Sequence, residues 1–248
     1  MAALSVLEAT ALTSLRTFLL SLPLVCQSGP IGFEVIEGQI NRVPEPEATD
    51  FAVMTATIRQ RMATNQDSFL DCAYLGSISG TLMTVAVVQL GTLSVGQPVM
   101  GSGVSAGILI AAQVGGTGGT GTYTLSGTAN TGGQTQLAGG TLSLMQETRL
   151  TVQIDVHGPN SGDNAQIIST AMRDGYAYDA FTSYGPGVFP LYADDPRQVP
   201  FINAENQYEY RWIIDCQLQI NPALAVPQAA AAQLVASIKE LDAVHPPA

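Results

Sequence analysis

Three glycines near the middle of the chain have the spacing of a phosphate-binding loop. Gly116, Gly118 and Gly121 form G-x-G-x-x-G, which lets a backbone approach a pyrophosphate closely where a strand leads into a helix. Such a site also needs a helix directly after the glycines and an acidic residue about 20 positions later. Here the strand-like run TYTL follows, and no acid appears before Glu147. The pattern therefore predicts a glycine-rich loop between strands and no nucleotide cofactor.

A second pattern has the spacing of a serine nucleophile. Gly103, Ser105 and Gly107 form G-x-S-x-G, which in α/β-hydrolases exposes the serine on a strand-to-helix turn. The run that follows, ILIAAQV, is typical of a strand instead. The two histidines available for a triad are His157 and His245, and His245 lies in a proline-flanked tail. We therefore do not expect a serine hydrolase.

Two groups of potential metal ligands could in principle hold a divalent ion. Asp155, His157 and Asp163 are close in sequence, and Asp194 precedes Asp195. Alternation along a strand turns Asp155 and His157 to the same polar face, so we interpret them as a solvated or interface-facing pair. The run DDPRQVP is typical of a turn. We predict no metal site.

The charge of the chain is low and acidic. Of its 248 residues 12% are charged, and the net charge is −11 with a pI near 4.3. A basic surface that holds nucleic-acid phosphates is therefore not expected. The cysteines, Cys26, Cys72 and Cys216, are odd in number and form no C-x-x-C pair, which is typical of reduced thiols in a cytosol.

The amino-acid composition changes sharply in the middle of the sequence. Residues 72–146 contain no Asp, Glu, Lys or Arg and hold 17 of the 25 glycines, whereas both flanks carry ordinary charge. This contrast indicates an inserted module. We place that module at residues 79–140, inside a discontinuous α/β domain formed by residues 1–78 and 141–248.

The uncharged window has the pattern of short strands joined by tight turns. We expect a small all-β sandwich or barrel rather than a disordered low-complexity segment, because enough apolar side chains are present for a core. The expected core residues are Val85, Val87, Leu93, Val95, Val99, Ile108, Ile110, Val114, Tyr123 and Leu125.

The flanks show helical and strand patterns in series. Apolar residues recur every three or four positions from Leu4 to Leu22, which predicts an amphipathic helix ended by Pro23 rather than a cleaved signal peptide. No other segment has the length and apolar character to cross a bilayer. Alternation over residues 150–157 predicts a half-buried strand.

Further along the chain, Ser161 or Asp163 is a candidate N-cap for a helix that contains Ile167, Ile168, Ala171 and Met172. A long strand is expected at residues 207–220. The tail after Pro227 favours either a helix or an edge strand.

Three sequence segments resemble those of a known family. They are GQINRVPEP at residues 38–46, VQIDVHGPNSGDNAQ at 152–166 and PLYADDPRQVPFINAENQYEYRW at 190–212. In their order and spacing, the chain resembles the neck or tail terminator proteins of tailed bacteriophages over residues 1–75 and 141–248. The uncharged window is similar to a glycine- and threonine-rich β-module that recurs in phage structural proteins.

The resemblance implies an α+β fold, a sheet flanked by helices, and a structural role without catalytic residues. It implies a closed ring, commonly a hexamer, that terminates the tail tube and joins it to the head connector or adaptor protein. The other partners it implies are the tail tube and, as a further candidate, the sheath protein. The protein would be assembled in the host cytoplasm and reside in the virion.

We add two expectations from the residues. An acidic lumen would repel phosphates, so double-stranded DNA would pass without specific binding. Tyr, Trp and Arg are enriched at interface hot spots, which favours the 206–212 run as part of a subunit interface, although a core tryptophan on a solvated strand fits equally. The candidate interface residues are Asn41, Arg42, Asp194, Arg197, Gln198, Glu205, Tyr208, Tyr210, Arg211 and Trp212. The alternative function is a non-viral carbohydrate-binding or surface-display module.

Overall fold

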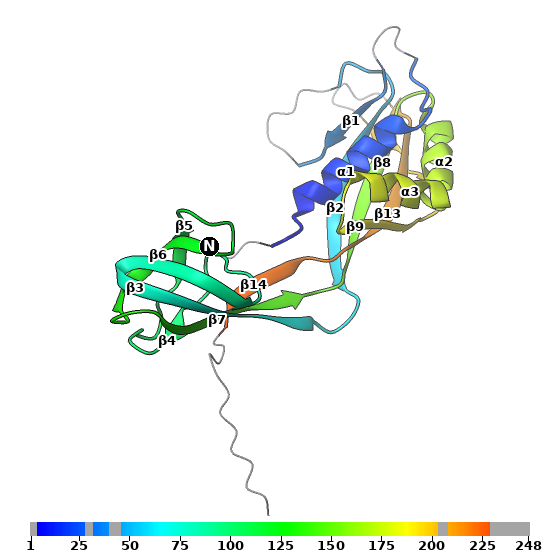
Figure 1. The fold of residues 1–248 in the computed structure, drawn as a ribbon. Helices are drawn as coiled ribbons and strands as arrows, with labels where there is room; N and C mark the ends of the chain where they lie inside the picture. Colours follow the sequence, from blue (N-terminus) through cyan, green and yellow to red (C-terminus); the bar gives the residue numbers. More distant parts are fainter. Residues whose placement is uncertain (1–3, 28–31, 40–45, 203–207, 229–248) are drawn as a thin grey trace, which may run out of the picture. The chain divides into compact units, whose positions relative to one another are not determined.

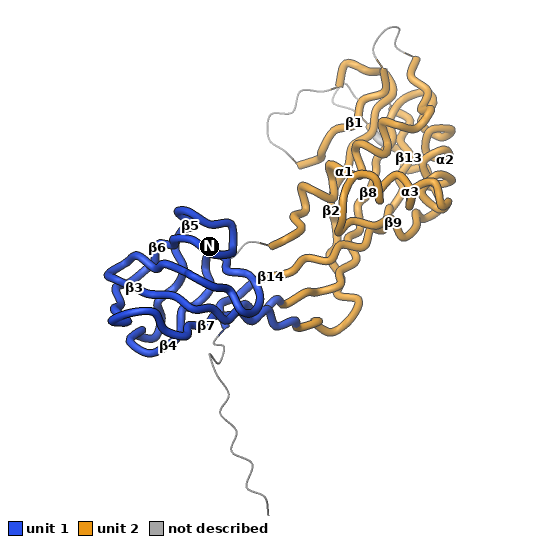
Figure 2. Tube along the Cα trace, viewed as in Figure 1, with its two compact units in different colours: residues 1–2, 68–143, 225–248 blue, residues 3–67, 144–224 orange. Residues whose placement is uncertain are grey.

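The computed structural model describes residues 4–27, 32–39, 46–202 and 208–228 (Figure 1). The chain divides into two compact units, which Figure 2 colours separately. Unit 1 consists of residues 1–2, 68–143 and 225–248, and unit 2 of residues 3–67 and 144–224. The longest segment of unit 1 thus begins at residue 68, near the start of the uncharged window.

Unit 2 contains all three helices of the described chain and a mixed sheet. The helices are α1 (Glu8–Ser21), α2 (Ser161–Met172) and α3 (Gly175–Tyr184). Its strands are β1 (Glu34–Glu37), β2 (Phe51–Arg61), β8 (Thr148–His157), β9 (Val188–Ala193), β10 (Arg197–Gln198), β11 (Phe201–Ile202), β12 (Tyr208–Glu209) and β13 (Arg211–Ile220).

The sheet of unit 2 has the order β1-β2-β8-β13-β10, with β9 also paired to β13. The β1–β2 pair is parallel, while β2, β8, β13, β9 and β10 pair antiparallel. Short β11 and β12 form a separate two-stranded ribbon. A sheet with helices on one face agrees with the predicted α+β class.

The core of unit 2 lies between this sheet and its helices. Alternate residues of β8 and β13, from Leu150 to Val156 and from Ile214 to Ile220, pack in one cluster with apolar residues of α1, α2 and α3. Because side chains alternate across a strand, the whole cluster lies on one face of the sheet. Phe18 and Phe181, both fully buried, meet there at 5.5 Å between ring centroids.

The N-terminal helix predicted from the apolar spacing is confirmed. Helix α1 ends at Ser21, and Ala11, Leu15 and Phe18 are fully buried, as the stripe required. Leu4 lies before the helix instead, in a bridge with Leu224. Among the described residues no helix has the length and apolar content needed to cross a membrane.

The prediction that β8 is half-buried is wrong. Leu150, Val152, Ile154 and Val156 face the core as expected, but the polar residues between them are also largely covered. Asp155 is 8% and His157 7% exposed, so the interpretation of a solvated pair does not hold. The reason is that β8 is a central strand, whose polar side chains pair with those of its neighbours β2 and β13.

The predicted N-caps of α2 are also wrong. The helix begins at Ser161, and the capping position is Asn160, whose side chain makes no capping bond. Asp50 holds Asn160 instead, because its Oδ1 accepts from the Asn160 backbone N–H at 2.7 Å. Helix α3, with Asp174 as its N-cap, was not predicted.

In its described residues, unit 1 has strands and no helix. They are β3 (Gln66–Leu90), β4 (Met100–Gly101), β5 (Ile110–Gln113), β6 (Gly121–Asn130), β7 (Thr135–Met145) and β14 (Ala223–Pro227), in the order β14-β7-β3-β6-β5 with β4 on β7. Seven of the ten predicted core residues are buried. Val87, Val95 and Val114 are exposed instead.

The long strand β3 turns back on itself at a glycine. Gly80 has a positive φ of 65°, a conformation that glycine adopts without strain. A β carbon on Gly91 would lie 2.2 Å from the backbone oxygen of Asp71, and one on Gly76 would lie 2.8 Å from that of Thr84. Residues on the two sides of Gly80 are therefore neighbours, so the halves of β3 run side by side.

The G-x-G-x-x-G stretch is a turn followed by a strand, as predicted. Gly116 and Gly118 lie between β5 and β6, and Gly121 begins β6. A β carbon on Gly121 would meet the oxygen of Gly115 at 2.0 Å. The glycine is thus required by the close approach of the chain to itself. The tail after residue 228, for which a helix or an edge strand was expected, lies outside the described residues.

Candidate assembly surfaces

The face of the unit 2 sheet opposite the core carries a set of paired polar side chains. We call it the polar sheet face, and it consists of Arg149, Thr151, Gln153, Asp155, His157, Arg211, Asp215 and Gln217, together with Arg197 on the neighbouring β10.

Ion pairs hold this face together. Arg211 donates from Nε and Nη2 to Asp155 Oδ1 at 3.2 and 2.8 Å, and Arg197 donates to Asp215 at 3.0 Å. The first pair is well covered, with the two side chains 22% and 11% exposed. Because the Asp155 carboxylate already accepts from Arg211, the charge of this pair is satisfied within the subunit.

His157 lies at the end of β8 in a similarly complete environment. Its ring stacks on Phe51 with centroids 4.7 Å apart and an angle of 3°. Its Nδ1 lies 2.9 Å from Glu209 Oε1. The histidine is thus fixed between β2 and β12, where it positions the ribbon strand rather than offering an open catalytic nitrogen.

The β11–β12 ribbon presents exposed apolar and aromatic side chains. Ile202 pairs with Tyr208 across the ribbon. Ile202 is 54%, Tyr208 83% and Tyr210 63% exposed. We call these three residues the tyrosine ribbon. Tyrosine is enriched at interface hot spots, so these exposed side chains suit a protein contact.

All tyrosines of unit 2 share this exposure. They are Tyr176, Tyr178, Tyr184, Tyr192, Tyr208 and Tyr210, each at least 36% exposed, whereas Tyr74 and Tyr123 of unit 1 are fully buried. Unit 2 is therefore the part of the described chain whose aromatic surface is richest.

The remaining predicted interface residues divide by location. Asp194 is half-buried and donates its backbone N–H to the Asp215 carbonyl at 3.0 Å. Arg197 and Gln198, on β10, are exposed. Trp212 is half-buried against the core, and a β carbon on Gly162 would lie 3.3 Å from its indole. Trp212 thus supports α2.

Three further candidates, Asn41, Arg42 and Glu205, lie outside the described residues. The structure brings Tyr208, Tyr210, Arg211 and Trp212 together along β12 and the start of β13, and Arg197 and Gln198 pair with the same strand.

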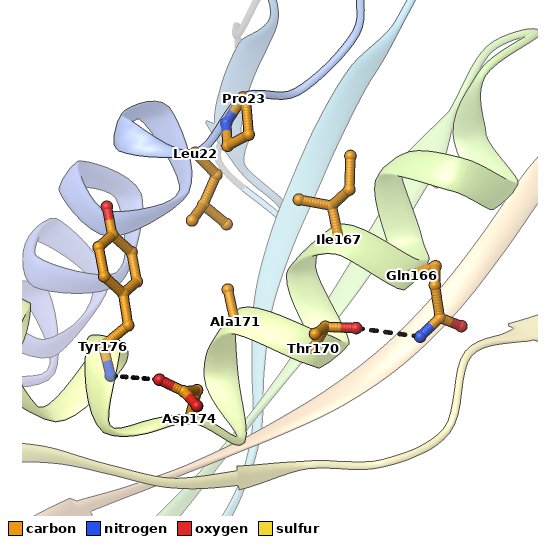
Figure 3. Close-up of a pocket in the computed structure, with 8 residues that line it drawn as sticks. All are labelled: Leu22, Pro23, Gln166, Ile167, Thr170, Ala171, Asp174 and Tyr176. Carbon is orange, nitrogen blue, oxygen red and sulfur yellow. Dashed lines mark hydrogen bonds between the residues drawn. The ribbon is translucent and has the colours of Figure 1, made fainter.

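An apolar groove opens between the helices of unit 2 (Figure 3). Its volume is about 460 Å³. Leu22 and Pro23 follow α1, Ile167 and Ala171 come from α2, and Tyr176 from α3, with the side chains of Leu22, Ile167 and Ala171 around one space. The lining is mainly apolar, and its polar members are Gln166, Thr170 and Asp174.

The motifs considered for catalysis belong to different units of the chain. Ser105 lies in a turn of unit 1 that leads to strand β5 instead of a helix. His157 belongs to unit 2, and His245 is not among the described residues. Asp195 accepts from Arg173 at 2.8 Å. Within the described ranges no three metal-ligating side chains converge.

Burial raises the pKa of two cysteine thiols. The pKa of Cys72, in the unit 1 core, rises to about 11 because its thiolate would lose hydration. Burial raises the pKa of Cys216 as well, and the nearby Asp215 and Asp194 charges raise it further. Both thiols therefore stay protonated near neutral pH and make poor nucleophiles.

Sequence reasoning missed two buried polar residues that tie unit 2 together. Asp50 is fully buried and accepts from the backbone N–H groups of Gln27 and Asn160. Asn164 is fully buried too, and its amide exchanges two 2.8 Å hydrogen bonds with the backbone of Val25. Their partners lie 23 to 139 residues away, so no local pattern could reveal them.

The chain matches the family model of phage neck terminator proteins over residues 109–243, which is more than half of its length. It therefore belongs to the phage neck terminator family, and it is a structural component of the bacteriophage virion. Such a family is typically non-enzymatic. No curated protein matches the sequence.

The matched region differs from the extent of the resemblance noticed in the sequence. It begins at residue 109, inside the uncharged window, and leaves residues 1–108 outside. Residues 109–140 are thus part of what the family model describes.

Proposed function

We propose that the protein assembles into a closed ring, most simply a hexamer, that terminates the tail tube and joins it to the head connector or adaptor protein. The observation that carries the proposal, beside the family match, is the tyrosine ribbon on a unit that belongs to a virion protein. Closed cyclic symmetry is the common state of soluble homo-oligomers. The tail tube is the second partner, and a sheath protein is a further candidate.

The ring would leave a central passage for double-stranded DNA. The net charge of −11 supports a passage whose wall repels phosphates. DNA would then move through without the salt-dependent adhesion that a basic wall causes. Family membership favours this virion function over the alternative of a non-viral carbohydrate-binding or surface-display module.

We also propose that the β unit is an accessory module. The charge-free composition of residues 72–146 and the separate core of unit 1 support this proposal. The module would contact a neighbouring virion protein or a host glycan. Its limits in the structure, residues 68–143, are a better guide to its extent than residues 79–140, because Tyr74 and Ile78 belong to its core.

The experiment that tests the ring is substitution of the tyrosine ribbon. Tyr208→Ser combined with Tyr210→Ser should weaken self-association at least tenfold, because two exposed aromatic anchors are lost while no core contact changes. Mass photometry and sedimentation velocity over a concentration series give the measurement.

The matched control is Tyr178→Ser combined with Tyr184→Ser, which removes two exposed tyrosines from α3. Equal effects of the two double variants would contradict a role specific to the ribbon. A wild-type protein that stays monomeric at every concentration, alone and with connector or tail-tube protein, would contradict the ring itself.

A further inference from the structure

The apolar groove of unit 2 lies along α2, at the end of α1 (Figure 3). Ile167 and Ala171, four residues apart on α2, pack against the core of unit 2 but are only half-buried. Leu22 and Pro23, which follow α1, line the same space. A groove with apolar walls between helices has the form that receives the apolar face of an amphipathic helix.

The sequence of the chain contains a segment with such a face. Residues 229–243, AAAAQLVASIKELDA, lie outside the described residues, and we call them the tail segment. Its large apolar residues, Leu234, Val235, Ile238 and Leu241, recur at i, i+1, i+4 and i+7, the spacing of one helix face. The alternation of a strand would divide them between two faces. Four alanines, the strongest helix formers, precede them, so the sequence favours a helix over an edge strand.

The tail segment belongs to the region that the family model describes. The match ends at residue 243, whereas the described chain ends at residue 228. All of the tail segment is therefore inside the matched region, and its apolar stripe is not an unrelated extension. An apolar stripe is stabilised when another surface covers it, and the groove on unit 2 is an apolar surface of the kind required.

The charges of the groove and the tail segment also match. Asp174 is the only charged residue among those that line the groove, and it is exposed. Its Oδ1 accepts from the backbone N–H of Tyr176 at 2.9 Å. Lys239, the one lysine of the sequence, directly follows Ile238 at the edge of the apolar stripe. A surface pair of Lys239 with Asp174 would add little affinity, but it would fix the direction in which the helix lies.

The length of the chain selects the copy that supplies the helix. Helix α1, 14 residues and thus about 21 Å long, separates Leu4 from the groove. Leu224 pairs with Leu4 in an antiparallel bridge, so β14 leaves this point opposite to the chain that leads into α1, and reaches Pro227 after roughly 10 Å. From Pro227 to Leu234 the chain spans at most about 25 Å. This is less than α1 and β14 together, so the groove of the same copy is out of reach.

We propose that the tail segment binds as a helix in the apolar groove of a neighbouring copy of this chain. Leu234, Ile238 and Leu241 pack against Ile167 and Ala171, and the Lys239 ammonium lies beside the Asp174 carboxylate. The contact joins two different surfaces, so it is heterologous, and such contacts close into a ring when the rotation allows. This inference rests on the proposed ring and names one of its contacts.

Chemical cross-linking of the full chain tests the contact directly. A carbodiimide joins a lysine amine to a carboxylate that it touches, and mass spectrometry of the digest should identify Lys239 linked to Asp174. Labelled (¹⁵N) and unlabelled protein are mixed in dilute solution and then concentrated, so that new assemblies contain both. The linked peptides should then combine one heavy and one light half. Linked peptides of a single label only, or no link between Lys239 and Asp174, would overturn the proposal.

Substitutions in the tail segment give the second test. Leu234→Asp with Leu241→Asp places two charges on the apolar stripe and should raise the Kd of self-association at least tenfold. The matched control is Ala236→Asp with Ala243→Asp, which adds the same charges at the same spacing on the opposite side of the predicted helix. The control should leave the Kd within about twofold of the wild type, because that side faces away from the groove.

Substitutions on the groove side complete the set. Thr170→Trp places an indole in the groove from an exposed position of α2 and should also raise the Kd at least tenfold. Its control is Thr182→Trp, the same change at an exposed position of α3 that is not among the residues lining the groove. Circular dichroism of each variant shows that the fold is retained.

The outcomes separate this contact from the ring itself. Equal weakening by test and control variants, or an unchanged Kd in the tail variant, would overturn the proposal. Weakening by Thr170→Trp without weakening by the tail variant would give the groove another occupant, such as the tyrosine ribbon, and would overturn it too. In these results the wild type still assembles, so the ring stands without this contact. A wild type that never assembles contradicts the ring as well.

Discussion

The Asp155–Arg211 pair gives the sharpest test of how the polar sheet face is stabilised. Its contacts of 2.8 and 3.2 Å correspond to a Coulomb attraction of roughly 5 kcal/mol at an effective dielectric constant of about 20. Desolvation of two well-covered side chains cancels much of this. We therefore expect a coupling energy of about 1.5–3 kcal/mol. Asp155→Asn alone should destabilise unit 2 by about 2–3 kcal/mol, since the covered guanidinium then faces a neutral amide.

A double-mutant cycle of Asp155→Asn and Arg211→Met measures the coupling. The assay is urea unfolding followed by the fluorescence of Trp212, the one tryptophan of the sequence, which packs in unit 2. The control cycle uses Arg173 and Asp195, a pair whose side chains are 46% and 89% exposed. Its coupling should stay below about 1 kcal/mol. A coupling for Asp155 and Arg211 no larger than that would refute the reasoning.

Two further predictions concern unit 1. Replacing residues 68–143 by a short Gly-Ser linker should leave the Trp212 unfolding transition of unit 2 in place. Replacing only residues 80–140 should instead cause aggregation, because Tyr74 and Ile78 lose their core partners. Equal behaviour of the two deletion variants would count against the boundary at residue 68. The unfolded thiol of Cys72 ionises near pH 9 and the folded one, with its raised pKa, near 11, so the stability of unit 1 should fall between these values by up to about 1.4 kcal/mol per pH unit. Urea unfolding by circular dichroism at pH 8 and 10 tests this, and a Cys72→Ala variant with an equally steep decline would show that another group is responsible.

Elements with strong local periodicity were predictable from the sequence. The apolar stripe of α1 and the alternation of β8 and β13 located these elements, because one face of each is set by local spacing. Helix α3 was missed because Tyr176, Tyr178 and Tyr184 give it no clear apolar stripe, and its buried side chains are limited to Ala177 and Phe181.

Burial on the polar side of the sheet could not be predicted in the same way. Alternating polar residues in β8 indicated a solvated face, but whether Asp155 is exposed depends on Arg211, which is 56 residues away. The interface candidates show the same limit. Composition marked the 206–212 run, and tertiary pairing then separated the accessible Tyr208 and Tyr210 from Arg211 and the half-buried Trp212.

The central claim is a closed ring, and electron microscopy of the purified full-length protein tests it most directly. Compact-domain scaling gives each subunit a width of roughly 30 Å, and six of these around a passage give a ring about 100 Å across. Two-dimensional class averages should show closed rings of that size with an open centre. Averages that contain isolated particles or open filaments alone, at concentrations where sedimentation detects assembly, would contradict the account.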